Sequence, residues 1–294
     1  MPKEKPRMLV IGSRGFLGHY AARAAAAEFE VFGANRTSRG KPGELMVDVT
    51  DETSVRAGFD AVRPHVVLLL AAISDIDHCE QFPEEAEAVN LRGSEFVAGN
   101  CARTQARLLF TSTGAVFDGR KHGYREEDPV SPVSVYGQTK AMAEKAIAML
   151  LPSALVVRIA LAIGFAGGKE ANGVLDNLRK RLASGQNVAF PIFEQRNPID
   201  AVTLSLFMLD LLNADARGVF HIGSQDSVTR YDLALKLASR MGYPGQIEAQ
   251  HAPAAGRAPR GPDHYLLTDK LRNTSTIPIP TCNEAIERCF DGVA

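Results

Sequence analysis

The sequence predicts an α/β protein built on a Rossmann-type, doubly wound parallel sheet, with a smaller C-terminal lobe packed against it. Apolar runs of strand length alternate with helix-period segments through the first half, which is typical of a parallel sheet covered by helices on both faces. A glycine-rich turn joins the first of these strands to the first helix. The second half has too few regular strands for another full sheet, which favours a smaller lobe.

The elements of the first half follow from their hydrophobic patterns. We expect strands at residues 8–11, 30–34, 44–49, 66–70, 107–111 and 154–159. We expect helices at residues 16–28, 53–62, 84–102 and 134–150. The run at 66–70 contains only Val and Leu, as expected of a strand buried on both faces. Pro152 ends the last helix, because proline cannot continue it.

The second half combines helices with loops. The expected elements are helices Val174–Ala183, Ala201–Asn213, 231–241 with Thr229 as its N-cap, and 283–290, and one strand, Gly218–Ile222. We expect loops at 164–173 and 251–263, the latter exposed because it is dense in Pro, Gly and Ala. The predicted organisation is a dinucleotide-binding domain over 1–160, to which 198–225 returns, and a smaller substrate-binding lobe over 161–294.

Composition excludes several classes of protein. The chain has 294 residues, 33 Lys and Arg against 34 Asp and Glu, and a formal net charge of −1. Such a balance gives no general attraction for nucleic acid or an anionic membrane. The apolar runs are too short to cross a bilayer, and the N-terminal residues lack a secretory pattern. The four cysteines and seven histidines show no metal-ligand spacing. We therefore expect a cytoplasmic protein with no metal, nucleic-acid or membrane partner.

The glycine-rich turn predicts a phosphate cradle. Gly12, Gly15 and Gly18 follow the first strand and open the first helix, which is the position of a dinucleotide fingerprint. Glycine permits unusual backbone conformations and close approach, and the free N–H groups of a helix start favour phosphate. Within the same turn we expect cofactor contacts from Arg14, Phe16 and Leu17. The spacing is GxxGxxG, and the alternative is a tight turn without a ligand.

The end of the second strand predicts the kind of nicotinamide cofactor. No carboxylate follows this strand; Arg36, Thr37 and Ser38 stand there instead. An acidic residue would bind the ribose hydroxyl of NAD, whereas a guanidinium can pair with the 2′-phosphate of NADP. The residues therefore favour NADP(H), with NAD(H) still possible. The alternative is a solvated basic loop.

A tyrosine and a lysine predict acid–base chemistry. Tyr136 and Lys140 are four residues apart, so they share one helix face. A free tyrosine titrates near ~10, and a nearby cation lowers that value, so the phenol could transfer a proton to or from a substrate oxygen. A hydroxyl from 111–113, at the end of a strand, could hold the same oxygen. The alternative is an amphipathic helix surface.

These motifs together resemble the extended short-chain dehydrogenase/reductase superfamily, and within it the dTDP-4-dehydrorhamnose reductase branch. The matching stretches are 12–18, Asp48-Val49, Ala71-Ala72-Ile73, Val89-Asn90, 112–119, 136–140, Val157-Arg158-Ile159, 218–223 and 230–234. The resemblance implies a catalytic set of Thr113, Tyr136 and Lys140, with Lys140 also binding the nicotinamide ribose. It implies a homodimer formed through the helices at 84–102 and 134–150.

The resemblance also implies further binding residues. Asp48 and Val49 would flank the adenine, and the 71–73 segment (Ala71, Ala72 and Ile73) would line the cofactor channel. Asn90 would lie on the helix behind the site, or else act as a buried, helix-bending amide. Asn172 falls in a substrate-side loop. Thr113 would contact the substrate as well.

Two departures from the branch bear on the substrate. Gly114-Ala115 stands where the family has Asp-Tyr, and Ala160-Leu161 replaces an aromatic after the sixth strand. A changed substrate or a loss of catalysis would account for them. We expect an NADPH-dependent reductase of a keto group on a nucleotide-linked deoxysugar. The alternatives are an NAD-dependent epimerase or dehydratase, and a non-catalytic NADP-binding subunit like the regulatory subunit of methionine adenosyltransferase.

Overall fold

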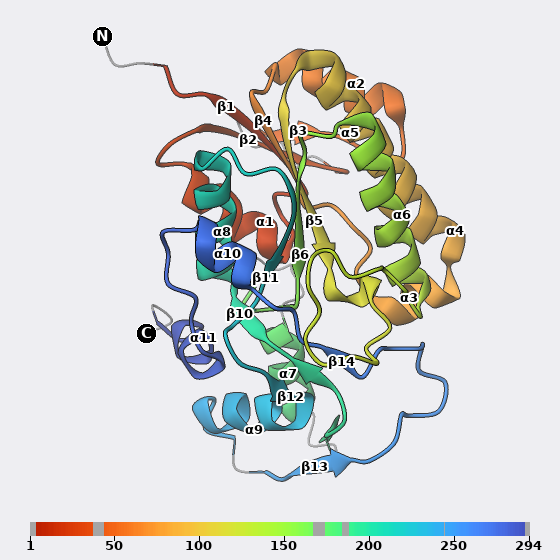
Figure 1. Ribbon diagram of the computed structural model, residues 1–294, viewed down its shortest axis with the longest axis vertical. Helices are drawn as coiled ribbons and strands as arrows, with labels where there is room; N and C mark the ends of the chain where they lie inside the picture. The colour runs from red at the N-terminus through yellow and green to blue at the C-terminus, as the bar shows by residue number, and fades with distance from the viewer. Residues whose placement is uncertain (1–3, 38–43, 167–173, 184–187, 244, 292–294) are drawn as a thin grey trace.

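A seven-stranded sheet forms the centre of the molecule. The computed structural model describes residues 4–37, 44–166, 174–183, 188–243 and 245–291. In this part of the chain the strands of the main sheet are all parallel and lie in the order β11-β6-β5-β4-β1-β2-β3 (Figure 1). Their bounds are Arg7–Ile11 (β1), Glu30–Asn35 (β2), Glu44–Met46 (β3), Val66–Leu69 (β4), Arg107–Thr113 (β5), Leu155–Ile159 (β6) and Gly218–Ile222 (β11).

Helices cover both faces of this sheet because successive strand residues point to opposite sides. In β1, Met8 and Val10 belong to one hydrophobic core, while Leu9 and Ile11 belong to the other. The first core includes helices α1 (Phe16–Ala25) and α8 (Ala201–Asn213); the second includes α2 (Glu52–Val62), α5 (Gly93–Thr104) and α6 (Val135–Leu150). Figure 1 shows these two helical layers on either side of the sheet. The predicted fold class is therefore confirmed.

The strand order places a crevice at the carboxyl ends of β1 and β4. From β1 the chain proceeds to β2 and β3 on one side and to β4, β5 and β6 on the other. Connections that leave neighbouring strands in opposite directions open a crevice at this switch point, where ligands bind in such sheets. The loops that follow β1, β4 and β5 all begin at this edge.

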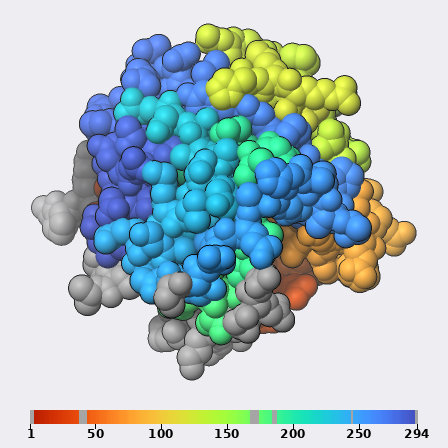
Figure 2. Space-filling view, turned by 90° about the horizontal axis from the view of Figure 1, so that it is seen from below, coloured from red at the N-terminus to blue at the C-terminus, as the bar shows by residue number. Residues whose placement is uncertain are grey.

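The second half adds three small sheets below the main one. β7 (Leu161–Ile163) pairs with β10 (Pro198–Asp200), and β8 (Val188–Pro191) pairs with β13 (Ile247–Gln250). β9 (Gln195–Arg196) lies between β12 (Val228–Thr229) and β14 (Asp263–His264). The helices here are α7 (Val174–Ala183), α9 (Arg230–Arg240), α10 (Asp269–Thr274) and α11 (Cys282–Arg288). Seen from below, this half of the chain covers most of the surface, with orange and yellow parts of the first half at its edge (Figure 2).

Several local expectations need correction. The helix expected at 84–102 is three segments: α4 (Pro83–Ala86), a π-helical stretch η1 (Glu87–Arg92) and α5. Asn90 lies in the π-helical stretch, and its side chain accepts from Ile73 N at 2.9 Å and donates to Ile73 O at 3.0 Å. β3 ends at Met46 instead of continuing to Val49. Helix α3 (Ile76–Gln81) was not expected, because it is too short to show a clear period.

Two further helices, α9 and α3, begin at residues whose side chains cap them. Thr229 caps α9 by accepting from Asp232 N at 2.9 Å, as expected. Asp75 caps α3 by accepting from His78 N at 3.0 Å. None of the helices in the described residues is both long enough and apolar enough to traverse a bilayer.

Candidate active site

A cavity of about 660 Å³ lies at the crevice between the two halves of the chain. Its lining comes from the glycine turn after β1, the segments after β4 and β5, the start of α6 and the β9–β14 region. Among the residues predicted from sequence, those that line it are Gly12, Gly15, Phe16, Leu17, Gly18, Ala72, Thr113, Tyr136 and Lys140. The structure therefore brings the glycine turn and the tyrosine–lysine pair to one space.

The glycine turn leaves the start of α1 open to this cavity. Gly12 has φ 92°, and a Cβ there would lie 2.7 Å from Ala71 N. A Cβ at Gly18 would collide with Gly12 O. Gly15 is the N-cap of α1, with no side-chain cap and no acidic residue in the first turn. Free N–H groups and a positive helix end suit an anion, so this cradle fits the diphosphate of a dinucleotide.

The corner at the end of β2 contains a carboxylate that the sequence did not reveal. Arg14 pairs with Glu44 at 3.1 Å and donates to Thr37 Oγ1 at 2.6 Å. Parallel pairing of β2 with β3 brings Glu44 opposite Gly33. The expectation that this corner lacks a carboxylate is therefore wrong, because strand pairing supplies one from farther along the chain. Arg36 is exposed; Ser38 lies outside the described residues.

Four other predicted cofactor residues lie behind the cavity wall or beyond it. Asp48 Oδ1 accepts from both the backbone and the hydroxyl of Thr50, at 2.9 and 2.7 Å. Val49 is buried, and a Cβ at Gly93 would touch it. Ala71 and Ile73 are half-buried in the segment after β4.

Asn90 is fully buried and holds that segment through Ile73. Its amide nitrogen also lies 3.3 Å from Thr139 Oγ1, so it connects the π-helical stretch to α6. The structure thus places Asn90 as a buried amide. Asn172 lies outside the described residues.

Thr113 and Tyr136 meet through a side-chain hydrogen bond. Thr113 ends β5, and its hydroxyl accepts from Ala115 N at 3.1 Å. Tyr136 lies in the first turn of α6, whose N-cap Ser134 accepts from Gly137 N. The Thr113 hydroxyl bonds to the Tyr136 phenol oxygen. The two hydroxyls can therefore act on one substrate oxygen in the cavity.

Burial controls the protonation of Tyr136 and Lys140. It raises the pKa of Tyr136 to about 12, and the Thr113 hydrogen bond opposes this shift. Burial lowers the pKa of Lys140 to about 7, and the charge of Glu144 opposes that shift. The Lys140 ammonium lies 3.9 Å from the centroid of the Phe110 ring. The expected lowering of the Tyr136 pKa by Lys140 is therefore wrong for this structure, because desolvation dominates.

A buried polar network supports the strand end from behind. Glu144, one turn after Lys140, accepts from the Ser112 hydroxyl and forms an ion pair with Arg158 at 2.7 Å. Arg158 also donates to Glu126 O at 3.2 Å and lies 3.4 Å from His221 Nε2. The sequence signals only that Lys140 and Glu144 share one helix face, since they are four residues apart; the partners Ser112 and Arg158 come from other strands. The network fixes Ser112, and with it the position of Thr113.

Four arginines from the second half of the chain also line the cavity, and no sequence motif indicates them. These residues, which we call the arginine wall, are Arg196, Arg230, Arg257 and Arg260. Buried Glu194 pairs with Arg257 at 2.6 Å and with Arg196 at 3.5 Å, while Asp77 pairs with Arg260 at 2.6 Å. The loop at 251–263 was expected to be exposed, but its last part is drawn in by these ion pairs. Such a concentration of guanidinium groups suits a ligand with phosphate groups.

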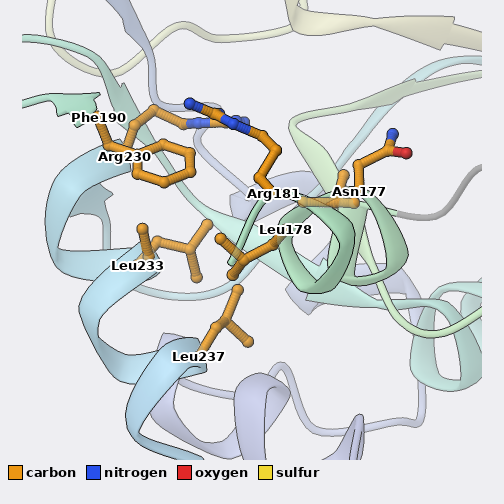
Figure 3. A pocket seen from close by; sticks show the side chains of 9 residues that line it. Asn177, Leu178, Arg181, Phe190, Arg230, Leu233 and Leu237 are labelled. Atoms are coloured by element: carbon orange, nitrogen blue, oxygen red, sulfur yellow. The ribbon is translucent and has the colours of Figure 1, made fainter. Parts of the chain in front are cut away.

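A smaller apolar pocket of about 120 Å³ adjoins this wall between α7 and α9. Figure 3 shows Leu178, Leu233 and Leu237 directed into the space between the two helices. Arg181 and Arg230 lie at one end, beside Phe190. The pocket shares Val174, Asn177 and Arg230 with the main cavity, so the two spaces are adjacent.

Comparison with known proteins agrees with this geometry. Residues 6–294 match the family described as RmlD substrate binding domain. A probable low-salt glycan biosynthesis reductase from Haloferax volcanii is 30% identical over 238 residues, 79% of each chain. Methionine adenosyltransferase 2 subunit beta from Pongo abelii is 29% identical over 247 residues, 81% of this chain and 73% of that protein.

A solved structure shares the whole fold. dTDP-4-dehydrorhamnose reductase from Bacillus anthracis, in complex with NADP, has a TM-score of 0.88 and 22% identity, covering 98% of this chain and 99% of that one.

Proposed function

This chain belongs to the RmlD substrate binding domain family, and on that premise we propose that it is an NADPH-dependent reductase of a keto group on a nucleotide-linked deoxysugar. The observation that carries the proposal is the convergence of Thr113, Tyr136 and Lys140 on the cavity that also contains the glycine turn. Hydride transfer needs the cofactor and a proton donor on the same carbonyl group.

The chain's own residues supply binding and proton transfer. NADPH, when bound, supplies the hydride. The turn from Gly12 to Gly18 and the start of α1 hold its diphosphate. Tyr136 protonates the carbonyl oxygen of the substrate as that oxygen gains negative charge, and the Thr113 hydroxyl donates a hydrogen bond to the same oxygen. Lys140 would hold the nicotinamide ribose from the same helix face as Tyr136.

The arginine wall supports a nucleotide-linked substrate. A diphosphate link carries two negative charges, and guanidinium groups bind such oxygens in pairs. Arg196 and Arg260 line the same cavity from the second half of the chain, and in this proposal they bind the substrate. The apolar pocket between α7 and α9 then accommodates the base of the nucleotide.

A direct test is a panel of nucleotide 4-keto-6-deoxysugars, including the dTDP and UDP forms, assayed by loss of NADPH absorbance. Turnover of at least one member, with a preference for NADPH over NADH, is the expected result. Tight NADPH binding with turnover of none would overturn the reductase proposal.

Two other functions each have an observation in their favour. The carboxylate of Glu44 beside Arg14 favours an NAD-dependent epimerase or dehydratase, because an acidic group near the end of β2 suits the ribose of NAD. The similarity to methionine adenosyltransferase 2 subunit beta, together with Gly114-Ala115, favours a non-catalytic NADP-binding subunit. Preferential binding of NAD(H) with no net consumption of reduced cofactor would favour the first, because its reaction is redox-neutral, and NADPH binding without turnover would favour the second.

We further propose a cytoplasmic homodimer formed through α5 and α6. Met142 and Met149 of α6 are 53% and 75% exposed, and large apolar side chains at a surface favour an interface. Light scattering after size exclusion tests this proposal, and a monomer at all concentrations would contradict it.

A further inference from the structure

His264 is a buried side chain on the cavity wall for which the proposed mechanism has no use. It is 5% exposed and lines the main cavity together with Thr113 and Tyr136. It belongs to β14, where it pairs with Arg196 of β9. Asn197 holds the segment that follows β14, because its side chain donates to Leu266 O at 2.9 Å and accepts from Leu266 N at 3.1 Å.

The small residues after β5 make room for this histidine. A Cβ built on Gly114 would lie 3.2 Å from the Cβ of His264 and 3.5 Å from Leu266. A larger residue at 114 would therefore press on the β14 segment. The departure at Gly114-Ala115 therefore bears on the position of His264. Small residues stand where the family has larger ones, and a histidine from the other half of the chain approaches Gly114.

The hydrogen bonding of the ring defines its chemistry. His264 Nε2 lies 3.2 Å from the carbonyl oxygen of Phe117. A carbonyl oxygen only accepts, so Nε2 carries the hydrogen and Nδ1 is left with a lone pair. Burial, assisted by the charge of Arg196, lowers the pKa of His264 to about 3. The ring is therefore neutral at ordinary pH, and within the described part of the chain no group donates to Nδ1.

We propose that Nδ1 of His264 accepts a hydrogen bond from a hydroxyl group of the bound sugar, so that His264 is a specificity-determining residue of the substrate site. This inference rests on the proposed function. A lone pair selects a donor, so it excludes the phosphates, which bind to the arginines, and the keto oxygen, which binds to Thr113 and Tyr136. A hydroxyl is the donor that a sugar offers at this wall.

The test separates the sugar's contribution from that of the nucleotide. The proteins compared are wild type, His264→Phe and His264→Asn. For each, calorimetry would give Kd for dTDP-glucose and dTDP, and for UDP-glucose and UDP. Both variants lose the bond to Phe117 O, but only asparagine keeps an acceptor near the position of Nδ1. His251→Phe is the matched control, because this histidine is exposed and does not line the cavity. Melting temperature and NADPH affinity verify folding.

In wild type the sugar should strengthen binding over the free nucleotide. His264→Phe should reduce that gain about 3- to 10-fold, the size of one hydrogen bond, while dTDP and NADPH affinities stay unchanged. His264→Asn should retain more of the gain than His264→Phe. An equal loss in both variants, or an unchanged gain in His264→Phe, would overturn the inference and leave the proposed function intact. Failure of wild type to bind any of these nucleotides would overturn both.

Discussion

Arg260 and Asp77 form an ion pair across the cavity, with two nitrogen–oxygen contacts of 2.6 and 3.1 Å. Asp77 belongs to α3 in the first half of the chain, and Arg260 belongs to the loop before β14. Both residues line the cavity. Arg260 lowers the pKa of Asp77, so the carboxylate is ionised and competes with any phosphate group for the same guanidinium.

This competition predicts opposite effects for the two partners. Arg260→Ala should weaken dTDP binding about tenfold, because a charge-assisted bond contributes roughly 1.5–3 kcal/mol. Asp77→Asn should leave dTDP binding unchanged or tighten it, since it frees the guanidinium. Calorimetric titration with dTDP measures both, and NADPH serves as the control ligand. Weaker dTDP binding in Asp77→Asn would mean that the pair positions Arg260 instead of competing for it.

Tyr136→Phe should abolish turnover while NADPH affinity stays nearly unchanged. The variant loses the phenol oxygen that bonds to Thr113 and donates the proton, but it keeps the ring. Steady-state kinetics with the substrate identified by the panel, together with NADPH fluorescence titration, provide the measurement. Substantial residual turnover would remove Tyr136 from the proton-transfer step.

Lys140→Met should stabilise the folded chain near neutral pH. Burial lowers the pKa of Lys140 from its ordinary 10.5 to about 7. Between these values the unfolded chain holds a proton that the folded chain lacks, so wild-type stability rises with pH across this window. Below about pH 7 the full cost of the buried charge applies. The advantage of the variant should therefore shrink as pH rises through the window.

Thermal unfolding of both proteins across that pH range measures the difference. Activity is not the readout, because Lys140 belongs to the proposed catalytic set. An advantage that stays constant with pH, or a variant less stable than wild type at neutral pH, would show that the contact with Phe110 offsets the cost of burial.

Replacing two helical glycines, Gly137 and Gly99, by alanine should change the stability of the fold in opposite directions. A Cβ at Gly137 would collide with Ala115 O, so Gly137→Ala should destabilise the fold by roughly 1–3 kcal/mol. Gly99 in α5 has nothing within 4 Å of such a Cβ, so Gly99→Ala should stabilise by about 0.5–1 kcal/mol. Urea unfolding compares the two variants. Equal effects of the two substitutions would contradict the close approach of α6 to the end of β5.

The sequence predicts the features of the fold and site that depend on local residue patterns. It predicts fewer of those that depend on contacts between residues far apart in the chain. The parallel sheet and the meeting of Thr113 with Tyr136 follow from strand and helix periods and from the common edge of parallel strands. The arginine wall does not, because Arg257 and Arg260 pair with residues 63 and 183 positions away. Their Pro- and Gly-rich surroundings indicate only a loop.

Glu44 illustrates the same limit at the cofactor corner. Its place beside Arg14 depends on the register of β2 with β3, in which Gly33 lies opposite Glu44. A pattern of apolar residues predicts that these strands exist, but it does not fix which residues face each other. The prediction of NADP preference therefore needs a test in which Glu44 is varied together with the basic residues.

Arg36→Ala should weaken NADPH binding by about one to two decades and leave NADH binding nearly unchanged. A guanidinium bond to the 2′-phosphate contributes roughly 1.5–3 kcal/mol, and NADH lacks that phosphate. Arg36 is exposed at the end of β2, while Arg14 is already paired with Glu44. Glu44→Gln should therefore tighten NADPH binding by freeing Arg14. Fluorescence titration of wild type and each variant with NADPH and with NADH measures these affinities and shows which cofactor each protein prefers. Stronger binding of NADH than NADPH by wild type would instead assign Glu44 to the ribose and favour the epimerase alternative.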